Sequence, residues 1–203
     1  MIRNIVFDIG DVLVEYSAIL CAKHYAIDYF QLEAANQILI RDEKWREYLN
    51  GLILVEDLLQ YFINAYPNQK NEFCMLLEKK YQNEILFLIT DNVELLKKVK
   101  EEHYQVYLLS NITKETLETI HENYDFIRWV DGGVFSYQEH VSKPDKKIYQ
   151  ILLERYHLEA EETLLIDDRF KNIEVASQLG IKGIQYQKGK QINLEMIRKM
   201  GGN

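Results

Sequence analysis

Five polar side chains stand directly after short apolar runs or beside a proline, at positions where they could converge on one site. They are Asp8, Ser110, Lys143, Asp167 and Asp168. If the three aspartates converge, their charges repel one another, and a hard divalent cation with oxygen ligands relieves that repulsion. The set therefore predicts a Mg²⁺ site built from carboxylates.

The remaining polar groups suit a phosphoryl group beside that cation. The hydroxyl of Ser110 and the backbone N–H of Asn111 can donate to phosphoryl oxygens, and Lys143 can neutralise charge in the transition state. Asp8, with an ordinary pKa near 3.9, is ionised at neutral pH and can take the phosphoryl group as an aspartyl phosphate. This chemistry makes a small phosphorylated molecule the expected partner.

The elements that must position these residues alternate between strand and helix. Predicted strands cover residues 4–7, 106–109, 134–135, 163–166 and 183–186, and predicted helices cover 93–102, 114–123, 145–156 and 172–179. Such alternation indicates an α/β fold with a parallel sheet and right-handed crossovers. Ligands of an open parallel sheet bind beyond the carboxyl ends of the strands, where the polar residues stand.

The middle of the chain is predicted to be helical. Between Asp11 and Asp131 the chain contains Gly51 and Pro67 but no other glycine or proline. Apolar residues recur there at helical spacing, which predicts helices over residues 18–30, 32–39, 45–49, 55–66 and 68–81. We therefore expect a core domain of residues 1–15 and 93–203, interrupted by a helical cap domain of residues 16–92.

Composition excludes several other classes of protein. The 203 residues carry 32 acidic and 24 basic side chains, a net charge of −8, which disfavours a nucleic-acid partner. Apolar runs such as residues 85–89 fall far short of the roughly 20 residues that span a bilayer. Without a long apolar run near Asp8, a signal peptide is not expected, and the prediction is a cytoplasmic protein without a membrane partner.

Four stretches of the sequence resemble the four motifs of the haloacid dehalogenase (HAD) superfamily. They are Phe7-Asp-Ile-Gly-Asp-Val-Leu13, Leu108-Leu-Ser-Asn111, Ser142-Lys-Pro-Asp145 and Ile166-Asp-Asp-Arg-Phe-Lys-Asn172. The resemblance covers the whole chain and implies a Rossmann-like core with a helical C1 cap over the substrate. It also implies that Ser110 and Lys143 hold the phosphoryl group and that Asn172 supports the loop of the fourth motif.

The same resemblance assigns the metal ligands. Asp8 is similar to the residue that serves as both nucleophile and ligand, and the carbonyl of Gly10 is similar to the second protein ligand. Asp168 matches the direct acidic ligand of the fourth motif, and Asp167 would act through a metal-bound water. The expected cofactor is therefore Mg²⁺.

One position departs from the phosphatase pattern of this superfamily. Most of its phosphatases carry a second aspartate two residues after the nucleophile, as acid to the leaving group and then base to water, and here that position is Gly10. General acid catalysis contributes about 10²- to 10⁴-fold in rate. Asp11 and His140 are the two candidates to replace it, although Asp11 could instead point away and His140 could face solvent.

The glycine leaves three functions open. A substrate with a good leaving group needs less protonation, and the Asp-x-Gly-x-Val pattern resembles a subset that includes a hexose-1-phosphate phosphatase, so a sugar phosphate is the leading hypothesis. A metal-independent dehalogenase also lacks the second aspartate, but Asp167 and Asp168 would then have little purpose. A ligand-binding relative without turnover is the third possibility.

Specificity is expected to come from the cap. Its aromatic and polar candidates are Tyr16, His24, Trp45, Arg46 and Tyr48, each of which could equally belong to the bundle core or the surface. Trp45 and Arg46 precede Gly51, a predicted helix stop near the cap tip, and are the preferred pair. The sequence does not predict the oligomeric state.

Overall fold

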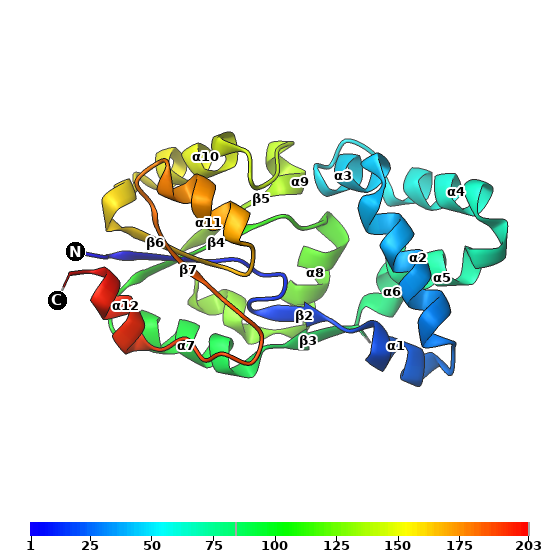
Figure 1. The fold of residues 1–203 in the computed structure, drawn as a ribbon, viewed down its shortest axis with the longest axis horizontal. Helices are drawn as coiled ribbons and strands as arrows, with labels where there is room; N and C mark the ends of the chain where they lie inside the picture. The colour runs from blue at the N-terminus through cyan, green and yellow to red at the C-terminus, as the bar shows by residue number, and fades with distance from the viewer. Residues whose placement is uncertain (84, 203) are drawn as a thin grey trace.

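A parallel sheet forms the centre of the core in the computed structural model, which describes residues 1–83 and 85–202 (Figure 1). Its strands are β1 (Asn4–Phe7), β4 (Gln105–Ser110), β5 (Gly132–Phe135), β6 (Thr163–Asp167) and β7 (Lys182–Gln185). They lie in the order β5-β4-β1-β6-β7, and Asn4 of the central strand lies opposite Gln105 on one side and Thr163 on the other. The predicted α/β fold with a Rossmann-like sheet is confirmed.

Helices cover both faces of this sheet, which explains why the middle residues of β1, β4 and β6 are apolar or aromatic. On one face, Ile5 and Phe7 of β1 belong to the same core cluster as side chains of α7 (Thr90–Glu101), α8 (Lys114–Asn123) and α12 (Leu194–Met200). On the other face, Val6 packs with side chains of α10 (Lys146–Tyr156) and α11 (Phe170–Ser177). The alternation of strand side chains thus supplies two buried layers.

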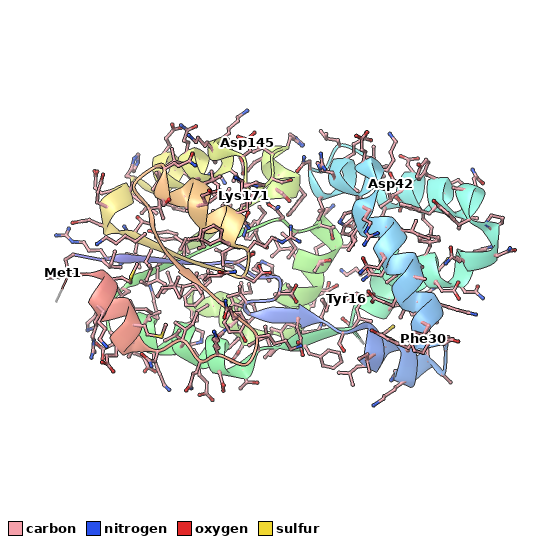
Figure 2. All side chains as sticks on the ribbon, viewed as in Figure 1. Met1, Tyr16, Phe30, Asp42, Asp145 and Lys171 are labelled. Carbon is pink, nitrogen blue, oxygen red and sulfur yellow. The ribbon has the colours of Figure 1, made fainter. Side chains whose placement is uncertain are left out.

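A second lobe of helices lies to the right of the sheet in Figure 1. It contains α1 (Ala18–Tyr25), α2 (Tyr29–Arg41), α3 (Glu43–Leu49), α4 (Val55–Ala65), α5 (Lys70–Leu77) and α6 (Lys79–Gln82). Leu32, Phe62 and Phe73 are fully buried within it, and the rings of Phe62 and Phe73 stack with centroids 4.8 Å apart. Phe30, by contrast, is 80% exposed at the outer side of this lobe (Figure 2).

Two of the predicted helices are wrong in extent. The helix expected over residues 18–30 ends at Ala26, which adopts a left-handed conformation with φ 52°, and Asp28 then caps α2 by accepting from the backbone N–H of Phe30 at 2.7 Å. The helix expected over residues 68–81 is interrupted by the extended backbone of Glu78, after a 3₁₀ turn at Pro67–Gln69. The C-terminal helix α12 was not predicted.

A short antiparallel ribbon joins the two lobes and was also not predicted. β2 (Val14–Tyr16) pairs with β3 (Leu86–Leu88), with Val14 opposite Leu88 and Tyr16 opposite Leu86. These strands lie near both junctions of the proposed insert, so the chain enters and leaves the helical lobe through adjacent segments. The domain limits at residues 16 and 92 stay a prediction.

Among the helices of residues 1–83 and 85–202, none is both long enough and apolar enough to cross a membrane.

Candidate active site

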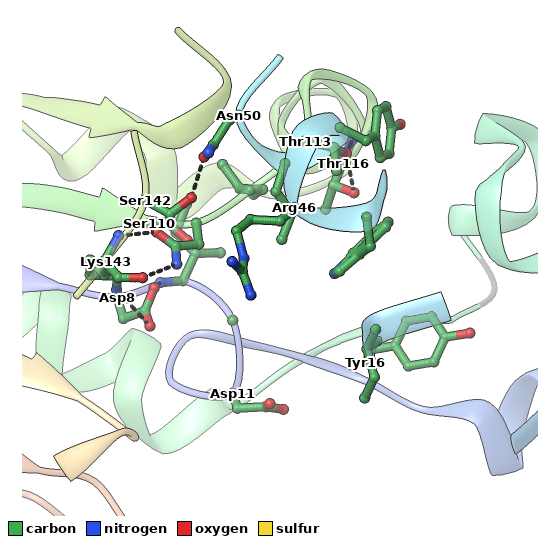
Figure 3. A pocket seen from close by; sticks show the side chains of 18 of the residues that line it. Asp8, Asp11, Tyr16, Arg46, Asn50, Ser110, Thr113, Thr116, Ser142 and Lys143 are labelled. Carbon is green, nitrogen blue, oxygen red and sulfur yellow. Dashed lines mark hydrogen bonds and ion pairs between the residues drawn. The ribbon is translucent and has the colours of Figure 1, made fainter. Parts of the chain in front are cut away.

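The residues singled out at the ends of the strands surround one cavity of about 970 Å³ between the sheet and the helical lobe (Figure 3). Asp8 follows β1, Ser110 ends β4 and Asp168 follows β6. Lys143 enters from the loop before α10. Parallel strands end at the same edge of the sheet, and this is why positions 8, 110 and 168 meet in space.

Three carboxylates cluster at the carboxyl ends of β1 and β6, and two of them, Asp8 and Asp168, line the cavity. Asp8, Asp167 and Asp168 each offer an oxygen, and these oxygens lie within 4.8 Å of one another. Asp8 is 6% exposed, Asp167 is fully buried and Asp168 is half-buried. Buried carboxylates at this spacing require a counter-charge, because removal from water disfavours their ionised form.

Lys143 supplies one such counter-charge from the same buried position. Its ammonium lies 2.8 Å from Asp8 Oδ2 and 2.7 Å from Asp167 Oδ2, and it donates to the carbonyl of Leu109 at 2.8 Å. Burial alone lowers the pKa of Lys143, but the two carboxylates outweigh that effect and raise it, so the side chain stays protonated. All three ammonium protons therefore have partners, and the lysine fixes Asp8 relative to Asp167.

Asp167 is held on its other side by the loop that follows β6. Its Oδ1 accepts from the backbone N–H of Arg169 at 2.9 Å, and Asn172 donates from Nδ2 to Oδ1 and Oδ2 at 2.8 and 3.0 Å. Both oxygens of Asp167 are thus engaged within the protein. Asp8 and Asp168 keep lone pairs for a ligand in the cavity.

The raised pKa values of Asp8 and Asp168 indicate that a ligand of this cluster must supply positive charge. Burial, reinforced by Asp167 and Asp168 and opposed by Lys143, raises the pKa of Asp8 to about 7. Burial also raises the pKa of Asp168, and the charges of Asp167 and Asp11 add to it. A divalent cation favours the ionised carboxylates, so the donor set fits Mg²⁺ held by Asp8 and Asp168.

The second motif contributes a buried hydroxyl and a clamp on the lysine loop. Ser110 is 1% exposed at the end of β4. Asn111 accepts from the backbone N–H of Lys143 at 2.7 Å and donates from Nδ2 to its carbonyl at 2.8 Å. The sequence predicts only the backbone N–H of Asn111 as a phosphate donor. Its side chain has a further role, because it positions the backbone of Lys143.

The two residues considered near the missing acid differ in position. Gly10 lines the cavity, and a Cβ added to it would meet no heavy atom within 4 Å. Asp11 has a left-handed backbone with φ 55°, and its side chain is directed away from Asp8 (Figure 3). Burial raises its pKa, while Lys188 and Arg169 oppose that shift. The structure therefore does not bring Asp11 to Asp8.

His140 takes part in the contact between the lobes. Its Nδ1 lies 2.8 Å from the carbonyl oxygen of Asn50, at the end of α3. Ser142 Oγ donates to Asn50 Oδ1, and Ser136 Oγ donates to the carbonyl of Leu49 at 2.6 Å. The end of α3 thus docks on the loop that carries Lys143, a contact with no signal in the sequence.

The cap candidates separate into those that reach the cavity and one that does not. Tyr16, Trp45, Arg46 and Tyr48 line it, whereas His24 does not. Tyr48 is tied to the core because its hydroxyl donates to a carboxylate oxygen of Glu115 at 2.6 Å. Arg46 extends from α3 into the cavity toward the Asp8 end (Figure 3).

Fold and site together define a Rossmann-like hydrolase with a helical insert after its first strand. The sequence model of the haloacid dehalogenase-like hydrolase family matches residues 2–180 of this chain. The chain belongs to this family. The expected family and enzyme class are therefore confirmed.

Two curated relatives extend over almost the whole chain. A D-ribitol-5-phosphate phosphatase of Bacteroides thetaiotaomicron is 25% identical over 211 residues, covering 97% of each chain. The sesquiterpene phosphatase astK of Aspergillus oryzae is 22% identical over 196 residues, covering 97% of this chain and 95% of that protein.

Solved structures share the fold. A magnesium complex of the HAD family enzyme bt-2542 from Bacteroides thetaiotaomicron superimposes with a TM-score of 0.76 at 22% identity, covering 97% of this chain and 98% of that one. A predicted HAD-like family hydrolase from Porphyromonas gingivalis gives a TM-score of 0.74 at 20% identity, with coverage of 100% and 99%.

Proposed function

We propose that this protein is a Mg²⁺-dependent phosphatase that hydrolyses a small phosphate monoester through an aspartyl phosphate on Asp8. The observation that carries the proposal is the cluster of three carboxylates within 4.8 Å, paired with one buried lysine. A dehalogenase would need the nucleophile but not this concentration of acid. Resemblance to two phosphatases along the whole chain supports the same reaction.

Each residue of the cluster has a distinct task in this reaction. An oxygen of Asp8 attacks phosphorus, the bond from phosphorus to the leaving oxygen breaks, and its electron pair stays on that oxygen. Ser110 and the backbone N–H of Asn111 bind the phosphoryl oxygens, and Lys143 orients Asp8 and favours its ionised form against the effect of burial. Water then attacks phosphorus, the bond from phosphorus to Asp8 breaks, and its electron pair returns to the carboxylate. Inorganic phosphate leaves with the protons of that water, and Asp8 is regenerated.

The metal ligands proposed are Asp8, the carbonyl of Gly10 and Asp168, with Asp167 acting through a water. Bound Mg²⁺ would neutralise the carboxylates and the charge of the phosphoryl oxygens. Since Lys143 and Asn172 occupy both oxygens of Asp167, an outer position suits that residue.

For the substrate we propose a sugar or sugar-alcohol phosphate. The relative that acts on D-ribitol 5-phosphate supports this class, and the amides of Asn36 and Asn50 offer polar contacts in the cavity wall. The resemblance of the Asp-x-Gly-x-Val stretch to a hexose-1-phosphate phosphatase points to anomeric phosphates within it.

Release of inorganic phosphate from a panel of esters, with and without Mg²⁺, tests the proposal. The panel should contain hexose 1-phosphates, sugar-alcohol phosphates and prenyl phosphates. Asp8→Asn keeps the shape of the site and removes the nucleophile, so we expect turnover to fall to background. Metal-independent turnover, or turnover that survives in Asp8→Asn, would rule out the mechanism. Faster turnover of prenyl phosphates would rule out the sugar class alone.

A further inference from the structure

The wall of the cavity that belongs to the helical lobe contains one charged side chain among its described residues. That side chain is Arg46, and the other cap residues of the lining are apolar, aromatic or amide side chains. Its guanidinium extends toward the loop that joins Asp8 to Asp11 (Figure 3). The cap therefore presents a single positive charge to the reacting end of the cavity.

This guanidinium is not committed to a carboxylate of the protein. Lys44, on the same helix, pairs with Glu47 at 2.7 Å, whereas no described carboxylate lies within 4 Å of Arg46. Arg46 is exposed and needs no partner for folding. An unpaired cation facing a phosphate site is available to an anionic ligand.

Docking of α3 on the core fixes where that charge stands. Asn50, one helical turn after Arg46, is bonded to His140 and Ser142, and Ser142 precedes Lys143. Residues four apart lie on the same face of a helix, so the anchored residue and the arginine face the core together. The helix that carries Arg46 is thus anchored beside the loop that carries Lys143.

The opposite wall leaves space where the superfamily resemblance places an acid. A Cβ at Gly10 would meet no heavy atom within 4 Å, so that side of the nucleophile is open. Lys143 cannot donate to a leaving oxygen there, because its three ammonium protons are bonded to Asp8, Asp167 and the carbonyl of Leu109. Charge that develops on a leaving oxygen therefore meets neither an acid nor the lysine from the core.

We propose that Arg46 is a catalytic residue that stabilises the leaving oxygen of the ester, an inference that rests on the proposed phosphatase function. As the bond from Asp8 to phosphorus forms, the bond from phosphorus to the leaving oxygen breaks, and the electron pair passes to that oxygen. An N–H of the guanidinium donates to it. The proton that completes the alcohol comes from water, since the guanidinium keeps its own protons.

The dependence of rate on leaving group tests this role. Wild type, Arg46→Ala, Arg46→Lys and Lys44→Ala are compared on phosphate esters from 2,4-dinitrophenyl phosphate to alkyl phosphates. Removing one donor to a developing oxyanion costs about 10²- to 10³-fold in kcat. We expect Arg46→Ala to lose about 10²-fold on alkyl phosphates and less than about threefold on the dinitrophenyl ester. Lys44→Ala, on the same helix but outside the cavity lining, should match wild type.

A second variant tests whether Arg46 acts where the acid is missing. Gly10→Asp in the Arg46→Ala background should restore at least about tenfold of the lost rate on alkyl phosphates, within the range of general acid catalysis. Rescue at position 10 would not follow from a merely structural role of Arg46.

The outcomes separate this inference from the function on which it rests. A wild type without Asp8-dependent phosphatase activity would overturn both. An active wild type whose leaving-group plot runs parallel to that of Arg46→Ala would overturn only the role of Arg46. So would a change confined to KM, because that pattern belongs to a ground-state anchor for an anionic group.

Discussion

Replacing Gly51 with alanine should undock the cap from the core. Gly51 follows α3 with a left-handed φ of 63°, and a Cβ there would overlap the carbonyl oxygen of Tyr137 and lie 3.1 Å from its carbon. A backbone group cannot rotate away as a side chain can. The end of α3 must therefore move off the segment of residues 136–142, whose first four residues form a short helix, α9 (Ser136–Glu139).

The size of the effect follows from what this movement breaks. A left-handed conformation costs a residue with a Cβ about 1–2 kcal/mol. Movement also breaks three hydrogen bonds, in which the carbonyl of Leu49 accepts from Ser136 and the oxygens of Asn50 accept from His140 and Ser142. Each contributes about 1 kcal/mol. We expect Gly51→Ala to lower the free energy of unfolding by about 4–5 kcal/mol, as the sum of these terms.

Gly189→Ala is the matched control. Gly189 has a left-handed φ of 84°, but a Cβ there meets no heavy atom within 4 Å. It should therefore lose only the conformational term of about 1–2 kcal/mol. Urea unfolding followed by tryptophan fluorescence, which comes from Trp45 on α3 and from Trp129 in the core, and by circular dichroism measures both variants. Equal losses in the two variants, within about 0.5 kcal/mol, would refute the docking argument.

Two further predictions concern the acidic cluster. In the metal-free protein, burial holds the pKa of Asp8 at about 7, well above its unfolded value. The native state then binds the proton more tightly than the unfolded state, so stability falls as pH rises from about 4 to 7. Because Mg²⁺ needs the ionised carboxylate, it should raise Tm more at pH 8 than at pH 5. An equal rise in Tm at both pH values would contradict this. Asn172→Ala should cost about 2–3 kcal/mol in urea unfolding, because a buried carboxylate loses its amide donor; a loss below about 0.5 kcal/mol would contradict it.

The sheet and the position of the site could be predicted because both depend on short-range patterns. Apolar runs such as residues 5–7 and 164–166 are buried on both faces of a parallel sheet, and such strands leave a clear signal in the sequence. Once the strands are parallel, the polar residues at their carboxyl ends must meet. That rule predicts that Asp8 and Asp167 lie close together, although the sequence contains no direct information on distances.

Other features depend on contacts that no local pattern encodes. The strands of the ribbon at Val14–Tyr16 and Leu86–Leu88 are three residues each, too short for periodicity to reveal them. Ala26 ends a helix in a left-handed conformation that glycine usually marks. The direction of Asp11 depends on its positive φ, and the docking of Asn50 depends on a partner about 90 residues away.

The register of the central strand also determines the order in which the molecule can be completed. Asn4 pairs with Gln105 and Thr163. During synthesis β1 therefore leaves the ribosome about 100 residues before one of its neighbouring strands and about 160 residues before the other. The helices between them make mostly contacts that are closer in sequence, and such contacts form sooner because less loop entropy must be lost. The helical lobe can therefore fold while the sheet is unfinished, and the nascent chain cannot bring Asp8, Lys143 and the acidic pair together until Asp168 has left the ribosome.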